Sequence, residues 1–185
     1  MNNIGKMNID EIERLVVASQ AGERCAFDEL VQIFQRQAMQ AAVRITGNAN
    51  EAAEAVQEAF AAAYIKIDKL KNPRKFAAWF LRIATNEAVN RRRQIKHRAE
   101  ILKSNLDCEY ETILQSKGTD EELREEIGQA MSKLSEKEAK AISLFGLDGL
   151  SHAQVAEIMD CSAAAAKWYV FRARQKLKIL LKEYL

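Results

Sequence analysis

Chain breakers and cysteines are scarce in this sequence of 185 residues. It contains one proline and seven glycines, whereas Ala, Glu, Lys, Leu, Gln and Arg are abundant, and this composition favours an all-α protein. Its three cysteines, Cys25, Cys108 and Cys161, lie far apart and form no CxxC pair, so we expect reduced thiols and no disulfide framework. His97 and His152 are isolated from other ligand types, and we therefore expect no metal site and no cofactor.

Long apolar runs and export signals are missing as well. No segment is apolar and long enough to span a bilayer, and the N-terminus MNNIGKMNIDEIERL lacks the basic and apolar pattern of a signal peptide. We therefore expect a cytoplasmic protein without membrane insertion. The chain also lacks a Ser/His/Asp set, a metal-ligand cluster and a phosphate-binding loop, so we do not expect an enzyme.

What the sequence does contain is alternating blocks of charge behind a net charge of +2. Residues 61–100 carry eleven Lys and Arg against three Asp and Glu, and residues 140–185 carry seven against four. Residues 1–60 and 101–139 are instead acidic, with nine acids against five bases and ten against five. Basic blocks on folded helices are typical of a protein that binds a polyanion, although a solvated charged surface gives the same pattern.

Helical periodicity and capping signals divide the chain into two small helical domains. Capping boxes are predicted at Asn8–Glu11, Thr119–Glu122, Ser135–Glu138 and Ser151–Gln154. Helices are predicted over residues 9–21, 25–46, 50–70 and 73–96, from about 120, from 135 to 146–149, and over 151–159 and 163–184. Weak periodicity and acidic character predict a flexible linker at 97–118, between domains at 1–96 and 119–185.

The C-terminal domain has the anatomy of a helix-turn-helix. A short capped helix is followed by a tight turn, with Ser162 as N-cap of a longer basic helix. The inward stripe of that second helix is Ala166, Val170, Ala173, Leu177 and Leu180. In such motifs the second helix enters the major groove, where Arg and Lys hold phosphates. The residues predicted to contact DNA are Ser162, Ala163, Ala164, Lys167, Trp168, Tyr169, Arg172, Arg174 and Lys176.

This block resembles domain 4 of the sigma-70 family of RNA polymerase sigma factors, where the run LSxxEIAxxxxxSxxxVKxxxxRAxxxL recurs. The match rests on Leu150, Ser151, Val155, Ala156, Ile158, Ser162, Lys167, Arg172, Ala173, Arg174 and Leu177. The preceding stretch, MSKLSEKEAKAISLFGLDG, is similar to the usual start of that domain. The resemblance implies that this domain reads the −35 promoter element and contacts the β flap of the polymerase.

Two further stretches resemble domain 2 of the same family. The first, EAAEAVQEAF from Glu51 to Phe60, is similar to the family run DAEDxVQExF. The resemblance implies that this helix docks on the clamp helices of the β′ subunit, through Glu51, Glu54, Gln57 and Glu58. Glu51 stands where the family has Asp, and Ala53 stands where an acid is usual, so we expect a weaker contact than in the family.

The second stretch, FAAWFLRIATN from Phe76 to Asn86, is similar to the start of the family run FxxWLxxIAxNxxxDxxRR. Helical spacing places Lys75, Trp79, Arg82, Asn86, Asn90 and Arg93 on one stripe, and Phe76, Phe80, Ile83 and Ala84 on the inward side. A cationic stripe with an aromatic residue suits a melted DNA strand. For Trp79, a place in the protein core is an equal alternative.

The resemblance implies that this second stretch binds the −10 promoter element, with the loop 69–75 helping to capture a flipped base. The residues predicted for this contact are Asn72, Arg74, Lys75, Trp79, Arg82, Asn86, Asn90, Arg91, Arg92 and Arg93. Asn90 departs from the family, which often has Asp at this position.

The resemblance covers about residues 20–95 and 120–182 and indicates the small extracytoplasmic-function (ECF) type, with two domains. It implies core RNA polymerase, promoter DNA and an anti-sigma factor as partners. It also implies that the acidic linker, with Asp107, Glu109 and Glu111, threads through the polymerase near the RNA path.

The recognition helix departs from the family, since residues 165–169 read AAKWY where TVKSR is frequent. Alanines offer no hydrogen bonds to base edges, so we expect weak or unusual −35 specificity, and Trp168 facing a partner protein stays open. Two alternatives remain. One is a helix-turn-helix regulator that does not bind polymerase, which needs neither of the domain 2 signatures. The other is a sigma-like interaction protein that has lost DNA binding.

Overall fold

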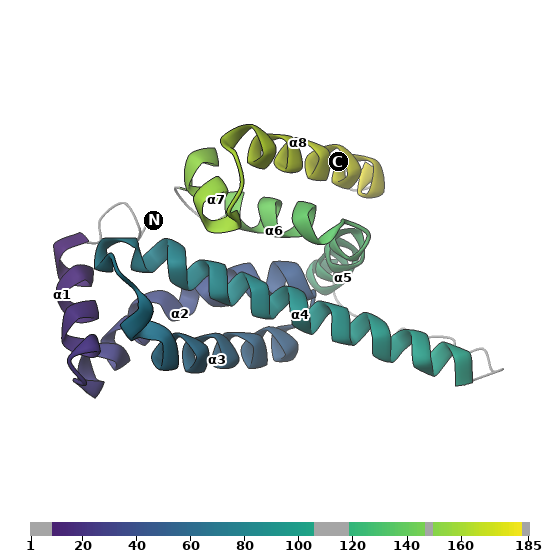
Figure 1. The fold of residues 1–185 in the computed structure, drawn as a ribbon. Helices are drawn as coiled ribbons and strands as arrows, with labels where there is room; N and C mark the ends of the chain where they lie inside the picture. Colours follow the sequence, from purple (N-terminus) through teal and green to yellow (C-terminus); the bar gives the residue numbers. More distant parts are fainter. Residues whose placement is uncertain (1–8, 106–118, 147–149, 183–185) are drawn as a thin grey trace.

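The computed structural model describes residues 9–105, 119–146 and 150–182, and helices are the only regular elements in those ranges. They are α1 (Ile9–Gln20), α2 (Arg24–Thr46), α3 (Ala49–Lys66), the 3-10 helices η1 (Ile67–Lys69) and η2 (Pro73–Lys75), α4 (Phe76–Asn105), α5 (Thr119–Ser132), α6 (Glu136–Phe145), α7 (His152–Met159) and α8 (Ala163–Leu180). Figure 1 shows α1–α4 as a bundle, here called the N-terminal unit, with α5–α8, the C-terminal unit, lying along α4. The prediction of an all-α protein is confirmed for the described residues.

Aromatic side chains of α2, α3 and α4 form the core of the N-terminal unit. Phe34, Phe76 and Phe80 are almost fully buried, and Phe60 stacks on Phe80 with ring centroids 4.4 Å apart. The buried face of α3 consists mainly of alanines, which let this helix pack closely on its neighbours. The predicted inward side of α4 is thereby confirmed, since Ile83 packs against the same core.

Caps and breakers determine where the helices begin and end. Gly47, with φ 75°, ends α2, and the next residue, Asn48, starts α3 by accepting hydrogen bonds from two backbone amides. The predicted boxes at Ser135 and Ser151 are present, each paired with the Glu or Gln at the third helical position. The predicted box that begins at Asn8 falls outside the described residues.

The helix-turn-helix forms from α7 and α8 as predicted. Asp160, with φ 55°, ends α7, and Ser162 caps α8 by accepting from the Ala165 amide at 3.1 Å. On the inward stripe Val170 is buried, like the alanines on either side of it, and Leu177 packs against the core shared with α5 and α6. Leu180 is exposed, so its predicted inward position is wrong, because that core ends at Leu177.

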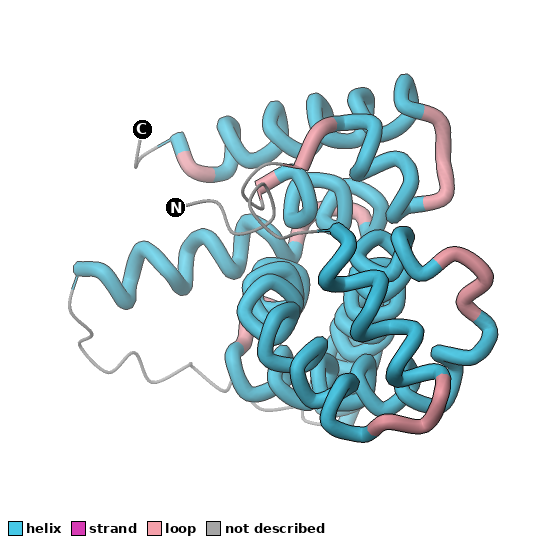
Figure 2. The backbone as a smooth tube through the Cα atoms, turned by 90° about the vertical axis from the view of Figure 1, so that its left-hand side faces the viewer, coloured by secondary structure: helices cyan, strands magenta, loops and turns pink. Residues whose placement is uncertain are grey.

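Two helices differ in length from the prediction. α4 continues past residue 96 to Asn105, because neither proline nor glycine interrupts it, and α8 ends at Leu180. Figures 1 and 2 show the C-terminal end of α4 projecting from the bundle. The predicted linker acids Asp107, Glu109 and Glu111 lie outside the described residues. Among the described helices none combines the length and apolarity needed to cross a membrane.

The two units share an apolar cluster. Ala41 of α2 and Leu81 of α4, both about 1% exposed or less, pack with Leu144, Val155 and other buried residues of α6–α8. This contact places the C-terminal unit against α2 and α4 and brings α6 and α7 next to the predicted −10 residues.

Candidate nucleic-acid interface

The predicted DNA-facing side of α8 is largely exposed. Ser162, Ala163, Ala164, Lys167, Trp168, Arg172 and Arg174 are all exposed, whereas Tyr169 and Lys176 are half-buried. Trp168 and Phe171 are 49% and 58% exposed, so α8 presents an apolar surface beside its basic residues. This surface offers cations and ring faces, whereas Ala163 and Ala164 in its first turn cannot hydrogen-bond to base edges.

Two of the predicted phosphate-binding residues are tied to α6. Lys176 Nζ lies 2.7 Å from Glu138 Oε2, and Arg172 Nε lies 3.5 Å from Glu138 Oε1. Burial acts to raise the pKa of Glu138, but hydrogen bonds from Lys176 and Ser135 outweigh it and hold the pKa below its ordinary value. These two cations therefore help to fix α8 on α6, because Glu138 is only 4% exposed in its side chain.

Aromatic rings also engage cations of the C-terminal unit. Arg172 lies over the Trp168 ring at 4.9 Å from its centroid, and Arg174 lies over the Phe145 ring at 4.7 Å. Such cation–π contacts hold the arginines close to the helix surface.

The predicted stripe of Lys75, Trp79, Arg82, Asn86, Asn90 and Arg93 begins at the end of η2, continues along α4 and is here called the α4 stripe. Four of its residues contact the C-terminal unit. Lys75 Nζ lies 2.9 Å from Glu157 Oε1, and Asn86 Oδ1 accepts a hydrogen bond from Lys140 Nζ at 2.6 Å. Arg82 donates to the carbonyl oxygens of Glu157 and Ile158 and lies 3.5 Å from Asp160 Oδ2. Arg93 pairs with both carboxylate oxygens of Glu136.

Ion pairing and burial shift the pKa values at this contact. The hydrogen bond from Arg93 holds the pKa of Glu136 below its ordinary value, and the same bond raises the pKa of Arg93. Burial, together with the charge of Arg82, lowers the pKa of Lys140 to about 8. Lys140 therefore loses its proton more readily at this contact than an ordinary lysine does.

The remaining predicted −10 residues are spread over the N-terminal unit. Asn72 accepts from the Arg74 amide and starts η2, and the Arg74 side chain pairs with Glu13 and Asp10 of α1. Trp79 is half-buried against the core, 5.8 Å from the Phe76 ring between centroids. Exposed Asn90 donates to Glu87 at 3.4 Å.

Arg91 and Arg92 do not lie with the α4 stripe. Arg91, with a side chain 10% exposed, extends toward α3 and pairs with Glu51, Glu54 and Glu58 at 3.5, 2.8 and 2.7 Å. Arg92 is 4% exposed and donates to backbone carbonyls at the end of α5, and its burial lowers its pKa. Buried, paired guanidinium groups are poorly suited to holding phosphates, so the predicted role of these two residues does not fit their placement.

The predicted polymerase-binding residues share one exposed face of α3. Glu54 and Glu58 have side chains 60% and 56% exposed, and Gln57 is exposed between them. Glu51 is more enclosed and also lies 3.7 Å from Arg98. Each exposed glutamate pairs one oxygen with Arg91, so this face is an acidic surface with a cation beneath it.

The acids that meet the α4 stripe, Glu136, Glu157 and Asp160, were not singled out from the sequence. Glu136 belongs to the predicted capping-box segment at Ser135, and Asp160 to the predicted turn. Nothing in the sequence around Lys140 indicates its burial, because that burial arises only when α6 packs against α4.

Models of known families match both units. Residues 30–98 match Sigma-70 region 2, and residues 124–177 match Sigma-70, region 4. The chain is 31% identical over 182 residues to the ECF RNA polymerase sigma factor SigW of Bacillus subtilis, a match that covers 93% of this chain and 97% of that relative. The chain belongs to the ECF RNA polymerase sigma factors.

Other relatives agree with this membership. The ECF RNA polymerase sigma-E factor of Escherichia coli K12 is 31% identical to this sigma factor over 175 residues, covering 88% of this chain and 90% of the relative. The family resemblance seen in the domain 2 and domain 4 motifs is therefore confirmed.

Two solved structures are similar in fold. CnrH, in complex with the cytosolic domain of CnrY, has a TM-score of 0.69 at 24% identity, covering 94% of this sigma factor and 98% of that chain. The sigma factor RpoE of Bartonella quintana, in complex with the anti-sigma factor NepR, has a TM-score of 0.62 at 25% identity, covering 84% and 96%.

Proposed function

We propose that this ECF sigma factor binds core RNA polymerase, directs it to specific promoters and helps to melt the DNA at transcription initiation. The proposal rests on a row of polar side chains beside the half-buried Trp79: Lys75 at the end of η2, and Arg82, Asn86 and Arg93 along one face of α4. Cations spaced along a helix can follow the phosphates of a melted −10 strand, and an aromatic edge can stack on a base. The sigma factor itself supplies binding and positioning and catalyses no reaction.

We assign the polymerase contact to the acidic face of α3. Glu54, Gln57 and Glu58 are exposed there and can pair with cationic side chains of the β′ clamp helices, with Glu51 at the rim. The C-terminal unit would contact the β flap. Since polymerase works on the bacterial chromosome, the proposal places the protein in the cytoplasm.

The proposed −35 contact is carried by the exposed N-terminal half of α8. Lys167 can bind a phosphate, and Ala163 and Ala164 can touch thymine methyl groups. Ser162, Tyr169, Arg172, Arg174 and Lys176 belong to the same predicted contact, although several of them also hold α8 in place. Because the two alanines at the start of α8 offer no hydrogen bonds to base edges, base discrimination at −35 should be weak or unusual.

We also propose an anti-sigma factor as a partner. The support is the similarity to RpoE of Bartonella quintana, which was solved with the anti-sigma factor NepR. The exposed apolar side chains Trp168 and Phe171 of α8 are suited to a protein contact.

The proposal can be tested by forming holoenzyme with core polymerase and titrating it with a pool of short, fluorescent single-stranded DNA of random sequence. Core polymerase alone sets the background. We expect added retention of DNA by the sigma factor, and its loss in an Arg82→Gln/Arg93→Gln variant, with the salt slope falling by about one per lost phosphate contact.

The matched control is Arg14→Gln/Arg24→Gln, which removes the same charge from exposed positions on α1 and α2. It should retain the strand as the wild type does. Equal loss of DNA retention in both variants would show that the effect depends only on net charge. Failure of the wild-type protein to bind core polymerase would contradict the proposed function.

A further inference from the structure

The α4 face proposed for −10 DNA is already occupied within this chain. We propose that the C-terminal unit is an internal competitor for that face, so that the closed arrangement of the two units and binding of a melted −10 strand exclude each other. The inference rests on the proposed function, because it takes the α4 stripe as the DNA-binding face. In the inference, the C-terminal unit of the same chain is a second partner of this face. Its helix C-termini and carboxylates bind the cations that would otherwise bind DNA phosphates.

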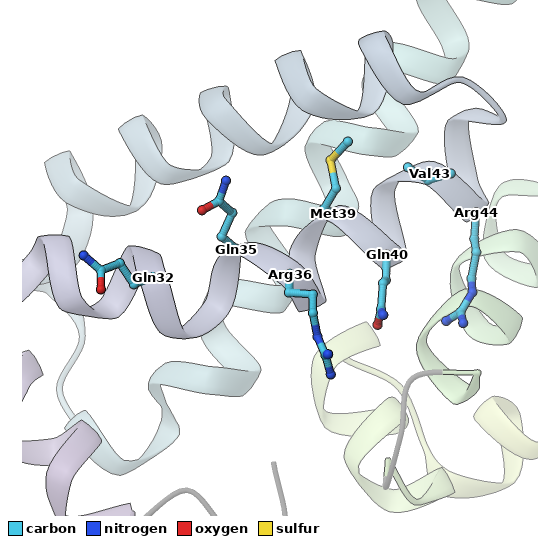
Figure 3. Close-up of a pocket in the computed structure, with 7 residues that line it drawn as sticks. All are labelled: Gln32, Gln35, Arg36, Met39, Gln40, Val43 and Arg44. Carbon is cyan, nitrogen blue, oxygen red and sulfur yellow. The ribbon is translucent and has the colours of Figure 1, made fainter. Parts of the chain in front are cut away.

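Three arginines of the N-terminal unit cap the C-terminal ends of three helices of the C-terminal unit. Arg44 donates to the carbonyl of Ser143, in the last turn of α6, at 3.3 Å. Figure 3 shows the Arg44 side chain extending from α2. Arg82 donates to carbonyls in the last turn of α7, at 2.6 and 3.1 Å. Arg92 donates to the carbonyl of Ser132, the last residue of α5, at 2.9 Å, and to that of Leu134.

Helix C-termini suit these arginines for a physical reason. The last carbonyl oxygens of an α-helix have no partner within the helix and carry partial negative charge, so a guanidinium satisfies them and is attracted to them. A phosphate oxygen offers the same guanidinium an anionic acceptor. Arg82, which belongs to the α4 stripe, can bind the end of α7 or a DNA phosphate, but its donors cannot serve both.

Carboxylates complete the match to a polyanion. Glu157 pairs with Lys75 at the end of η2, and Asp160 and Glu136 pair with Arg82 and Arg93 of α4, so three cations of the α4 stripe each meet an acid of the C-terminal unit. Both partners are partly exposed in every pair, so each pair alone is weak and open to competition.

Apolar contact makes the closed arrangement more than a set of surface ion pairs. Leu81 and Ala41, buried against Leu144, Val155 and Leu150, would be exposed if the units separated. The exposed face of α8 is not part of this contact, since Trp168 and Phe171 remain open. Closure therefore engages the cations of the proposed −10 face and leaves the proposed −35 face accessible.

The test uses the full-length protein without polymerase. Glu136→Gln/Glu157→Gln/Asp160→Asn removes the three acids that face α4 and changes no residue assigned to DNA or polymerase. The matched control, Glu23→Gln/Asp28→Asn/Glu29→Gln, makes the same chemical changes at exposed positions on α2 and just before it. Small-angle X-ray scattering gives the radius of gyration, and fluorescence anisotropy gives the affinity for the random single-stranded pool.

We expect a larger radius of gyration for the first variant and about three- to tenfold tighter DNA binding than for the control, because three weak pairs no longer oppose opening. An unchanged radius of gyration together with equal DNA affinity in both variants would overturn the inference. If wild-type holoenzyme still retains the strand in the earlier experiment, the proposed function is unaffected by that result. Failure of wild-type holoenzyme to retain the strand would instead remove the proposed function, and the competitor with it.

Discussion

At the scale of single residues, arginines with similar sequence context have different roles. Arg91, Arg92 and Arg93 are consecutive, yet they meet α3 carboxylates, the end of α5 and Glu136 respectively. Neighbouring residues on a helix point about 100° apart, so a run of three spreads over most of its circumference. The motif RR in the family run therefore does not define one binding surface.

Arg91 offers a direct test of this division. Arg91→Met leaves three glutamates of α3 without their shared cation, and two of them are more than half exposed, so we expect the free energy of unfolding to fall by about 2 kcal/mol and core polymerase to bind more weakly. Arg98→Met breaks only the exposed contact at 3.7 Å with Glu51 and should cost less than about 1 kcal/mol. Urea unfolding and titration with core polymerase measure both effects; equal behaviour of the two variants would refute the special role of Arg91.

Ser162 combines a structural role with a proposed place at the DNA. Ser162→Ala removes the α8 cap and should lower the free energy of unfolding by about 1 kcal/mol, whereas Ser162→Asp keeps a capping oxygen and should be close to wild type. The added negative charge of Ser162→Asp should still weaken binding to duplex promoter DNA. Thermal unfolding and duplex titration separate the two roles, and undiminished DNA binding by Ser162→Asp would argue against a contact at this end of α8.

At the scale of helices, most of the fold could be predicted from periodicity and caps. The boxes at Ser135 and Ser151 and the N-cap Ser162 place α6, α7 and α8 correctly, because local hydrogen bonds alone determine these starts. The end of α4 was missed, since residues 97–105 lack a clear apolar stripe and yet contain no helix breaker. The predicted inward side of α4 packs in the core as expected. What contacts the opposite, outward side depends on packing between the units, and this has no local sequence signal.

The contact between α4 and α6 should respond to pH through Lys140. Its pKa of about 8 in the closed arrangement is below the ordinary lysine value that an opened, solvated side chain regains. Between these two pKa values, closing the units releases the proton of Lys140. The free-energy cost of burying the charged amine therefore opposes closing fully below pH 8, and it falls as the pH rises toward about 10.4. We expect the radius of gyration to fall over this range.

Several charged or titratable groups surround Lys140 and must be separated from it. They are Arg82 and Arg93 of α4, Glu136 and Lys137 of α6, Asp160 and Cys161 of the turn, and Tyr169 of α8. Lys140→Gln keeps a donor for Asn86 and removes only the titrating amine, so its scattering curve should change less with pH than that of the wild type. Identical pH profiles for the two proteins would assign the response to the other groups.

At the scale of the whole molecule, two modest helical units are joined through a surface that also carries the proposed DNA contact. The N-terminal unit has its own aromatic core, and the C-terminal unit relies on smaller clusters, one of which it shares with α2 and α4. Small cores of this kind gain stability from docking. Core polymerase would have to replace that docking with contacts of its own for the α4 face to reach DNA.

Run-off transcription distinguishes a sigma factor from other DNA-binding proteins, because a transcript requires both binding to core polymerase and opening of a promoter. Core polymerase is supplied with fragmented genomic DNA from the source organism, with and without the protein. We predict discrete new transcripts that depend on the protein, disappear with Arg82→Gln/Arg93→Gln and persist with Arg14→Gln/Arg24→Gln. If the protein yields no new transcript and does not bind core polymerase, it does not act as a sigma factor. That result would favour a helix-turn-helix protein that acts without polymerase.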